Sequence, residues 1–316
     1  MNRCCGNAQT PAQDHFRIHV APRESIPMSA IDSSRSVRVR EALERWGLPW
    51  RTRRWKGGVG GFQGRGAGGA LDFEDHRPYA PGDDLRHLNW QAYGRTGVHT
   101  LKIFRPEVAP LLDVALDRSA SMGLTPAKDQ CARALAQWAV ESGRAAGASV
   151  RFWECGTQGA QSLELAGLSS VTWEDALSGE TPGAPAWENV LWRTGGMRVF
   201  VSDLLWPGDP GPVLDSLARG VGHAVVLAPF AAAESDPEWE GNVDLRDCES
   251  ASRRVICISG AVRRAYQEAY ASHFALWEAA AQQRQIPLAR IPDAEDLADV
   301  LGRFALPVGA VEAAAL

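Results

Sequence analysis

The chain has 316 residues, a formal net charge of −5, and a composition that is 45% hydrophobic and 22% charged. This length suits one large domain or a domain with an appended module, and the acidic balance argues against bulk affinity for nucleic acid. The six cysteines form no C-x-x-C pair, which argues against a zinc knuckle or thioredoxin-like site and makes a reducing cytoplasm the simplest expectation. No apolar run reaches the roughly 20 residues of a membrane-spanning helix.

Residues 1–30 show no hydrophobic periodicity. Residues 1–34 are expected to form a disordered tail, and residues 1–27 lack the apolar core of a signal peptide. Region 35–107 begins with an arginine-rich segment, 36–46, that has helical spacing. This basic helix could bind RNA, DNA or anionic lipid, but the acidic overall charge favours a solvated helix flanking the core. The stretch 57–69 holds eight glycines without a Gly-Lys-Ser/Thr ending, which predicts a flexible loop.

Residues 108–305 alternate between strand-like and helix-like segments, which predicts an α/β sheet with helices on both faces. Region 35–107 is expected to form a smaller, β-rich or irregular part, and residues 306–316 a second tail. The expected strands are 111–117, 149–155, 197–203, 223–230, 254–259 and 286–291, and the expected helices are 127–147, 187–193, 209–220, 261–285 and 294–304.

Polar side chains follow the first of these strands. Asp117, Ser119 and Ser121 stand at positions i, i+2 and i+4, and their hard oxygen atoms suit Mg²⁺ or Mn²⁺ better than zinc or copper. Asp203 ends another strand, and ligand sites in such sheets form beyond the carboxyl ends of strands. The sequence therefore predicts a metal site at this edge. The alternative is that Asp117 and Ser119 only cap the following helix.

Asp-x-Ser-x-Ser after a strand resembles the metal-ion-dependent adhesion site of von Willebrand factor type A domains. A second block, Arg-Pro-Tyr-Ala-Pro-Gly-Asp-Asp-Leu-Arg, lies at residues 77–86. The ordered combination resembles the signature of the bacterial domain-of-unknown-function 58 family over roughly residues 57–305. The remaining matches are Trp90, Gly94-Arg95, Glu107, Met122 and Leu245-Arg246-Asp247-Cys248-Glu249, whereas Asn89 replaces the usual Asp before the Trp.

This resemblance implies a von Willebrand factor A-like, Rossmann-like fold and a binding protein that is not an enzyme. It also implies a MoxR-type AAA+ ATPase as partner, in the assembly or maturation of other proteins. In such a site Ser119 and Ser121 would bind Mg²⁺ directly, and Asp117 and Asp203 directly or through water. One open position would accept a carboxylate from the partner.

The resemblance also requires a threonine from another loop to complete the metal site. Thr181 is the first candidate, because Gly-Glu-Thr precedes the short helix expected before the Asp203 strand. Thr172 and Thr194 remain alternatives.

The block at 77–86 has two interpretations. Asp83, Asp84 and Arg86 could face the partner protein. The favoured interpretation is structural, because Pro-Gly-Asp-Asp is ordinary turn chemistry and the arginines can pair with carboxylates.

Two other functions stay open at this stage. The first is a Mg²⁺-dependent phosphatase or phosphotransferase that uses Asp117, although Ser119 stands where such chemistry commonly has a second Asp. The second is a binder of nucleic acid or a membrane surface through the basic segment. No Gly-x-Ser-x-Gly, H-E-x-x-H or Walker motif supports another class of enzyme.

Overall fold

The computed structural model describes residues 28–50, 72–81, 83–84, 88–105, 109–163, 184–220, 222–250, 252–294 and 296–314. Its main body is built on a six-stranded sheet of order β11-β8-β7-β4-β5-β6. The first five of these strands run parallel, and the edge strand β6 pairs antiparallel with β5. The strands are β4 (Leu111–Asp117), β5 (Ser149–Gly156), β6 (Gly159–Leu163), β7 (Met197–Val201), β8 (His223–Phe230) and β11 (Leu288–Pro292). The expected α/β class is confirmed as a mostly parallel sheet with helices.

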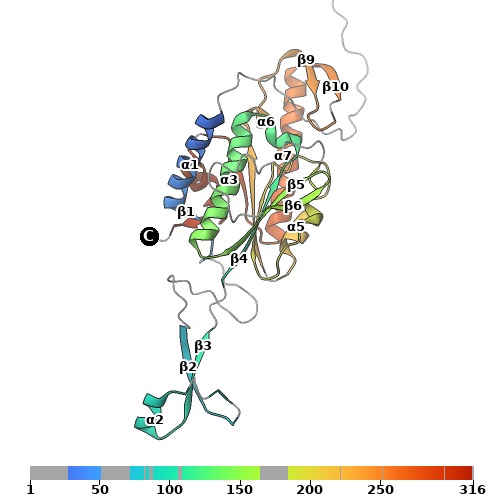
Figure 1. Ribbon diagram of the computed structural model, residues 1–316. Coiled ribbons are helices and arrows are strands. Elements are labelled where there is room, and N and C mark those ends of the chain that lie inside the picture. Colours follow the sequence, from blue (N-terminus) through green and yellow to red (C-terminus); the bar gives the residue numbers. More distant parts are fainter. Residues whose placement is uncertain are drawn as a thin grey trace, which may run out of the picture.

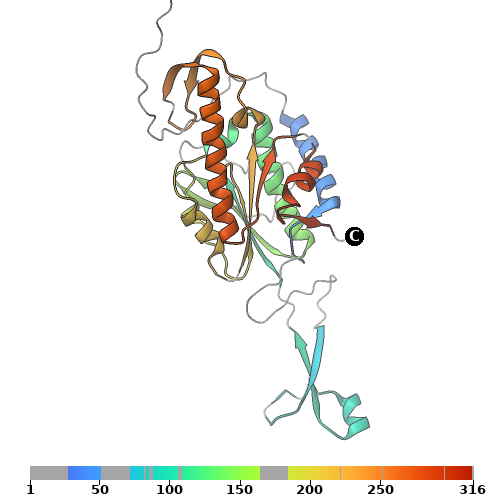
Figure 2. The same cartoon turned by 180° about the vertical axis from the view of Figure 1, so that it is seen from behind.

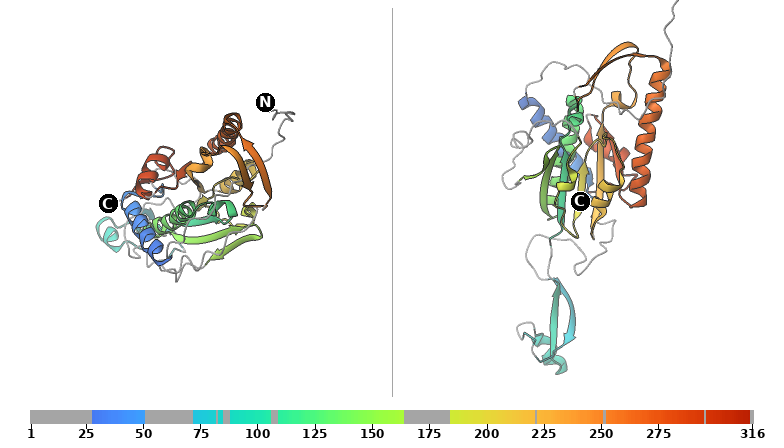
Figure 3. Two further views of the ribbon diagram at one scale, coloured as in Figure 1. Left: turned by 90° about the horizontal axis from the view of Figure 1, so that it is seen from above. Right: turned by 90° about the vertical axis from the view of Figure 1, so that its right-hand side faces the viewer.

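Helices cover both faces of this sheet (Figures 1, 2 and 3). Because alternate strand residues point to opposite faces, β4 supplies both cores: Leu112, Val114 and Leu116 pack on one side and Ala115 on the other. The carboxyl end of this central, doubly buried strand is Asp117. The first core also contains α1 (Met28–Arg45), α3 (Pro126–Ala145) and α8 (Leu297–Val300), and the second α5 (Gly211–Ala218) and α7 (Gly260–Gln283). Shorter helical turns are η2 (Ala120–Gly123), η4 (Trp187–Asn189), α6 (Ala232–Ser235) and η5 (Leu301–Ala305).

The helix α1 belongs to this body and corrects the expected boundary of the N-terminal tail. It begins at Met28, whereas residues 1–27 lie outside the described residues. Its Val39 is buried, and Arg35 is only 1% exposed, with Nε donating to Gln137 Oε1 at 3.2 Å. At least one arginine of the basic segment, Arg35, therefore packs on the core and is not exposed to solvent.

The expectation of a tail at 306–316 is wrong over its described part. The strand β12 (Glu312–Ala313) pairs with β1 (Trp46–Gly47), and Ala310 and Val311 are buried. A two-residue strand and small apolar residues leave no periodic pattern in the sequence, which is why the pairing was not predicted.

The smaller N-terminal part consists of an antiparallel hairpin, β2 (Asp72–Pro78) and β3 (Thr100–Arg105), with α2 (Trp90–Thr96) between its strands. Figure 1 shows it extending away from the sheet. Asn89 caps α2, because its side-chain oxygen accepts from Ala92 N at 3.1 Å. Asn89 therefore fills an N-cap role in which Asn and Asp are equivalent.

A second hairpin, β9 (Gly241–Arg246) and β10 (Arg253–Ile258), lies between β8 and α7 in the sequence. The sequence analysis predicted β10 but missed both β9 and the edge strand β6. Both missed strands are polar and partly exposed, so neither presents the apolar run that marked the central strands. Within the described ranges, none of the helices is long and apolar enough to cross a bilayer.

Candidate functional site at the carboxyl edge of the sheet

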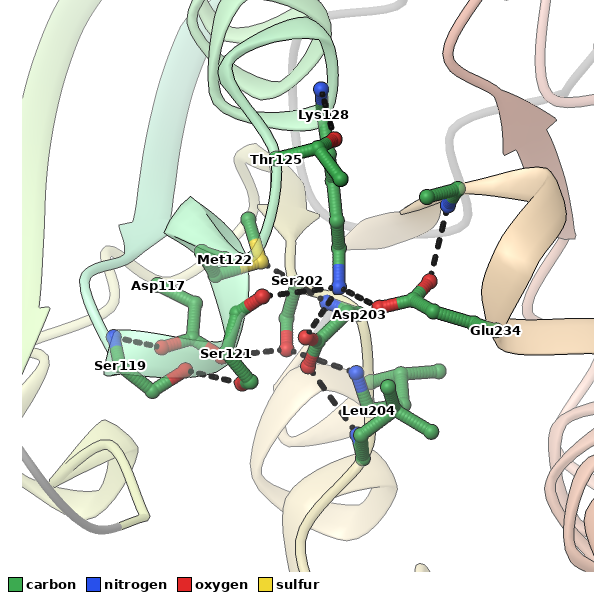
Figure 4. Close-up of polar contacts among 12 residues, drawn as sticks. Asp117, Ser119, Ser121, Met122, Thr125, Lys128, Ser202, Asp203, Leu204 and Glu234 are labelled. Carbon is green, nitrogen blue, oxygen red and sulfur yellow. Dashed lines mark hydrogen bonds and ion pairs between the residues drawn. The ribbon is translucent and has the colours of Figure 1, made fainter. Parts of the chain in front are cut away.

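The structure brings together four of the predicted site residues. Asp117 ends β4, Ser119 and Ser121 lie in the loop and helical turn that follow, and Asp203 comes two residues after β7. Since β4 and β7 are parallel neighbours, their carboxyl ends meet at one edge of the sheet, as Figure 4 shows. The Ser119 and Ser121 hydroxyl oxygens lie 3.1 Å apart.

Asp117 is fully buried, with 0% exposure. Its Oδ1 accepts from Ser119 N at 2.7 Å, and its Oδ2 accepts from Ser202 Oγ at 2.6 Å. Burial and the negative charge of Asp203 raise the pKa of Asp117 to about 7, although these hydrogen bonds favour the ionised form. Neither of these two partners carries a positive charge.

A buried lysine that the sequence analysis did not select also lies in the site. Lys128 Nζ donates to Asp203 Oδ2 at 2.7 Å and to Ser121 O at 3.0 Å, and forms an ion pair with Glu234 (Figure 4). Burial alone would lower the pKa of Lys128, but the charges of Asp203 and Glu234 raise it above its ordinary value. Lys128 is therefore a permanent ammonium ion within the site.

The two acidic partners of Lys128 respond differently to burial. Burial would raise the pKa of Asp203, but the charge and hydrogen bond of Lys128 hold it below its ordinary value. Burial raises the pKa of Glu234 in spite of the ammonium. Lys128 thus forms ion pairs with both carboxylates.

Both missed residues had a recognisable signal. Glu234 lies in α6, just after the carboxyl end of β8, the strand next to β7, so the rule that selected Asp117 and Asp203 also applies to it. Lys128 is in the first turn of α3, whose N-cap is Thr125. A cation there opposes the helix dipole, and its position points to an acidic partner elsewhere.

The backbone after β7 is bent to present Asp203. Leu204 has φ of +59°, a left-handed conformation that is uncommon for a residue with a branched side chain. Its N–H donates to Ser202 Oγ at 3.1 Å, and Leu205 N donates to Asp203 Oδ1 at 3.1 Å. Non-glycine residues in this left-handed conformation are found more often at functional sites than elsewhere.

Of the three candidate threonines, Thr194 lies among the described residues. Thr181 and Thr172 lie outside the described residues. Thr194 is exposed and precedes β7, so it lies at the opposite end of that strand from Asp203 and is excluded from the site.

Asp83 of the upstream block agrees with the structural interpretation. Asp83 accepts from both terminal nitrogens of Arg77, at 2.8 and 2.6 Å, and from Ala80 N at 2.9 Å. These contacts stabilise a turn next to the β2–β3 hairpin, and the Asp83 carboxylate is bound within that turn. Asp84 is exposed, and Arg86 lies outside the described residues.

The donor set fits a hard cation. Among the described residues, no group of three or more His, Cys, Asp or Glu side chains is arranged to hold a metal, so a site here depends on hydroxyl oxygens. The Ser119 and Ser121 hydroxyls converge beside a buried carboxylate whose described partners are neutral. Oxygen ligands with one or two carboxylates are the set that Mg²⁺ uses.

No family model matches the chain, and no curated protein matches it. An aerotolerance-related membrane protein from Bacteroides fragilis, solved with multiple mutations to serines, is 16% identical with a TM-score of 0.29, over 56% of this chain and 98% of that one. The conserved hypothetical protein BatB from Bacteroides thetaiotaomicron is 12% identical with a TM-score of 0.32, over 63% and 98%. At such TM-scores these likenesses carry no inference about function.

Proposed function

We propose that this chain is a non-enzymatic, Mg²⁺-dependent protein-binding component of the domain-of-unknown-function 58 type, with a von Willebrand factor A-like domain. It acts in the cytoplasm with a MoxR-type AAA+ ATPase in the assembly or maturation of other proteins. The observation that carries this proposal is the convergence of the Ser119 and Ser121 hydroxyls beside buried Asp117 at the carboxyl edge of a parallel sheet.

The charges of the site support a divalent cation. Lys128 balances Asp203, whereas the described partners of Asp117 are a backbone N–H and a hydroxyl. A buried carboxylate with neutral partners is costly to ionise. A metal held by Ser119 and Ser121, with Asp117 bound directly or through water, would supply that carboxylate with a counter-charge.

The same geometry disfavours the phosphotransfer alternative. A nucleophilic aspartate must reach the phosphorus atom of its substrate. The Asp117 side chain has no exposed surface that a substrate could approach. The alternative of a basic arm is disfavoured because Arg35 and Arg38 donate to Gln137 and Gln130 of α3, which makes part of that arm a packing surface.

Mg²⁺ should stabilise the wild-type chain, and the double variant Ser119→Ala, Ser121→Ala should lose that response. A ligand that binds only the native state at about 100 times its Kd adds roughly 2.7 kcal/mol to the free energy of unfolding. The measurement is thermal unfolding in Mg²⁺ and in EDTA. Ser142→Ala is the matched control, because this buried hydroxyl accepts from Leu48 N at the other end of α3. If Mg²⁺ stabilised the double variant as much as the control, Ser119 and Ser121 would not be metal ligands.

The partner requires a separate test. The wild-type chain should bind the purified MoxR-type ATPase of its own host in Mg²⁺, and EDTA or the double serine variant should weaken this binding about tenfold or more, because one coordination bond to a partner carboxylate is lost with its charge. Binding can be measured by calorimetry with each protein intact. Tight binding that is indifferent to both EDTA and the double variant would show that the ATPase docks elsewhere.

A further inference from the structure

The turn of the β9–β10 hairpin places an acidic residue, Glu249, against the loop that carries Ser119 and Ser121. Glu249 Oε1 accepts a hydrogen bond from Ser121 N at 3.0 Å, across 128 positions of sequence. The sequence analysis singled out residues 245–249 without giving them a role. The backbone nitrogen and the hydroxyl of Ser121 belong to one residue and are separated by only a few covalent bonds. A carboxylate bound to that nitrogen is therefore next to a hydroxyl of the proposed metal site.

The turn that carries Glu249 is held by its own hydrogen bonds. Asp247 Oδ1 accepts from Glu249 N at 2.9 Å, and Asp247 N donates to Ser252 O at 2.9 Å. Ser250 Oγ donates to Asp247 Oδ2 at 2.5 Å. These bonds fix the backbone on both sides of Glu249, so the direction of its side chain is set by the hairpin.

The base of the hairpin is tied to the elements that hold Lys128. The rings of Trp239 and Tyr266 lie 6.0 Å apart, and the Tyr266 hydroxyl donates to Glu234 O at 2.6 Å. Glu234 is the ion-pair partner of Lys128. Figure 2 shows the hairpin beside the start of α7, the helix that carries Tyr266. The hairpin and the site are thus linked at two points, the Glu249 turn and the Glu234 backbone.

We propose that Glu249 is an intramolecular acidic ligand of the cation bound at Ser119 and Ser121, supplied by the β9–β10 hairpin. Its carboxylate is a hard oxygen donor that already contacts the loop on which both hydroxyls lie. The inference rests on the proposed function, because it assigns one more ligand to the same site. An acidic side chain of a partner would enter by replacing Glu249.

Mn²⁺ alone is the probe, and Glu249→Gln is the variant. The glutamine oxygen can still accept from Ser121 N, so the loop keeps its hydrogen bond while the ligand charge is lost. The control is Asp244→Asn, which makes the same charge change on the same hairpin at an exposed carboxylate that pairs with Arg253. Calorimetry should show Mn²⁺ affinity about 10-fold weaker or worse in Glu249→Gln, and within about twofold of wild type in Asp244→Asn because an exposed charge is screened.

A second measurement separates a ligand from a residue that only supports the loop. Removal of the side chain in Glu249→Ala should let a water molecule take the vacated position, so the water-proton relaxation caused by bound Mn²⁺ should rise. Equal Mn²⁺ affinity in wild type and Glu249→Gln would overturn the role of Glu249 as a ligand. It would not contradict the metal site formed by Ser119 and Ser121. A wild-type chain that binds no Mn²⁺ would overturn the proposed metal site as well, so the two failures are distinguishable.

Discussion

Replacing Lys128 by methionine should lower the free energy of unfolding by about 3–5 kcal/mol, the range for removing one partner of a buried ion pair. Lys128 has 0% exposure and Asp203 1%. Methionine keeps most of the volume but leaves Asp203, whose pKa is held low mainly by this ammonium against burial, without its counter-ion. It also leaves Ser121 O without a described donor. Urea unfolding measured without divalent cations gives the loss directly.

Two controls make this result specific. Arg133→Met removes a cation from the same helix, where Arg133 pairs with Asp129 at a partly exposed position, and should cost no more than about 1 kcal/mol. The triple variant Lys128→Met, Asp203→Asn, Glu234→Gln removes all three charges together and should recover much of the loss, because neutral replacements of buried ion pairs are often tolerated. A loss for Lys128→Met no larger than for Arg133→Met would mean that the ammonium does not neutralise the site.

The part of the site that could be predicted follows from strand order and strand ends. Asp117 and Asp203 each close an apolar run, and in a parallel sheet such ends share one edge, so their proximity follows from the sequence pattern. Their burial could not be predicted in the same way. It depends on their contacts with Ser202, with Met122 of η2 and with Lys128 of α3, which no periodicity encodes.

The residues that were missed depend on contacts between distant parts of the chain. Lys128 reaches Glu234 across 106 positions, and Ser121 reaches Glu249 across 128. The positions of Glu234 after a strand and of Lys128 at a helix start are visible in the sequence, but the distant residue that each contacts is not. The β1–β12 pair is a similar case, since two-residue strands are specified by the tertiary fold that brings them together.

In EDTA, the stability of the wild-type chain should fall as the pH rises from about 4 to 7, relative to Asp117→Asn. Burial raises the pKa of Asp117 to about 7 in the folded chain, whereas the unfolded chain ionises near the ordinary value of 3.8. Between these values the folded state keeps a proton that the unfolded state has released. The stabilisation of the folded state that comes from protonated Asp117 is therefore complete below about pH 4. It is lost as the pH rises through about 7, and the total change in the free energy of unfolding is up to roughly 4 kcal/mol.

Asparagine removes the titration and keeps the size of the side chain, so the difference between the two chains reports the titration of Asp117 together with its electrostatic interaction with Asp203. Denaturant unfolding at several pH values between 4 and 8 measures it. Saturating Mg²⁺ should reverse the trend for wild type only, because a cation binds the ionised carboxylate and releases its proton, so Mg²⁺ stabilises more at pH 8 than at pH 5. A wild-type minus Asp117→Asn difference that stays constant from pH 4 to 7 in EDTA would show that Asp117 is ionised throughout, and that its charge is balanced by a group other than a bound cation.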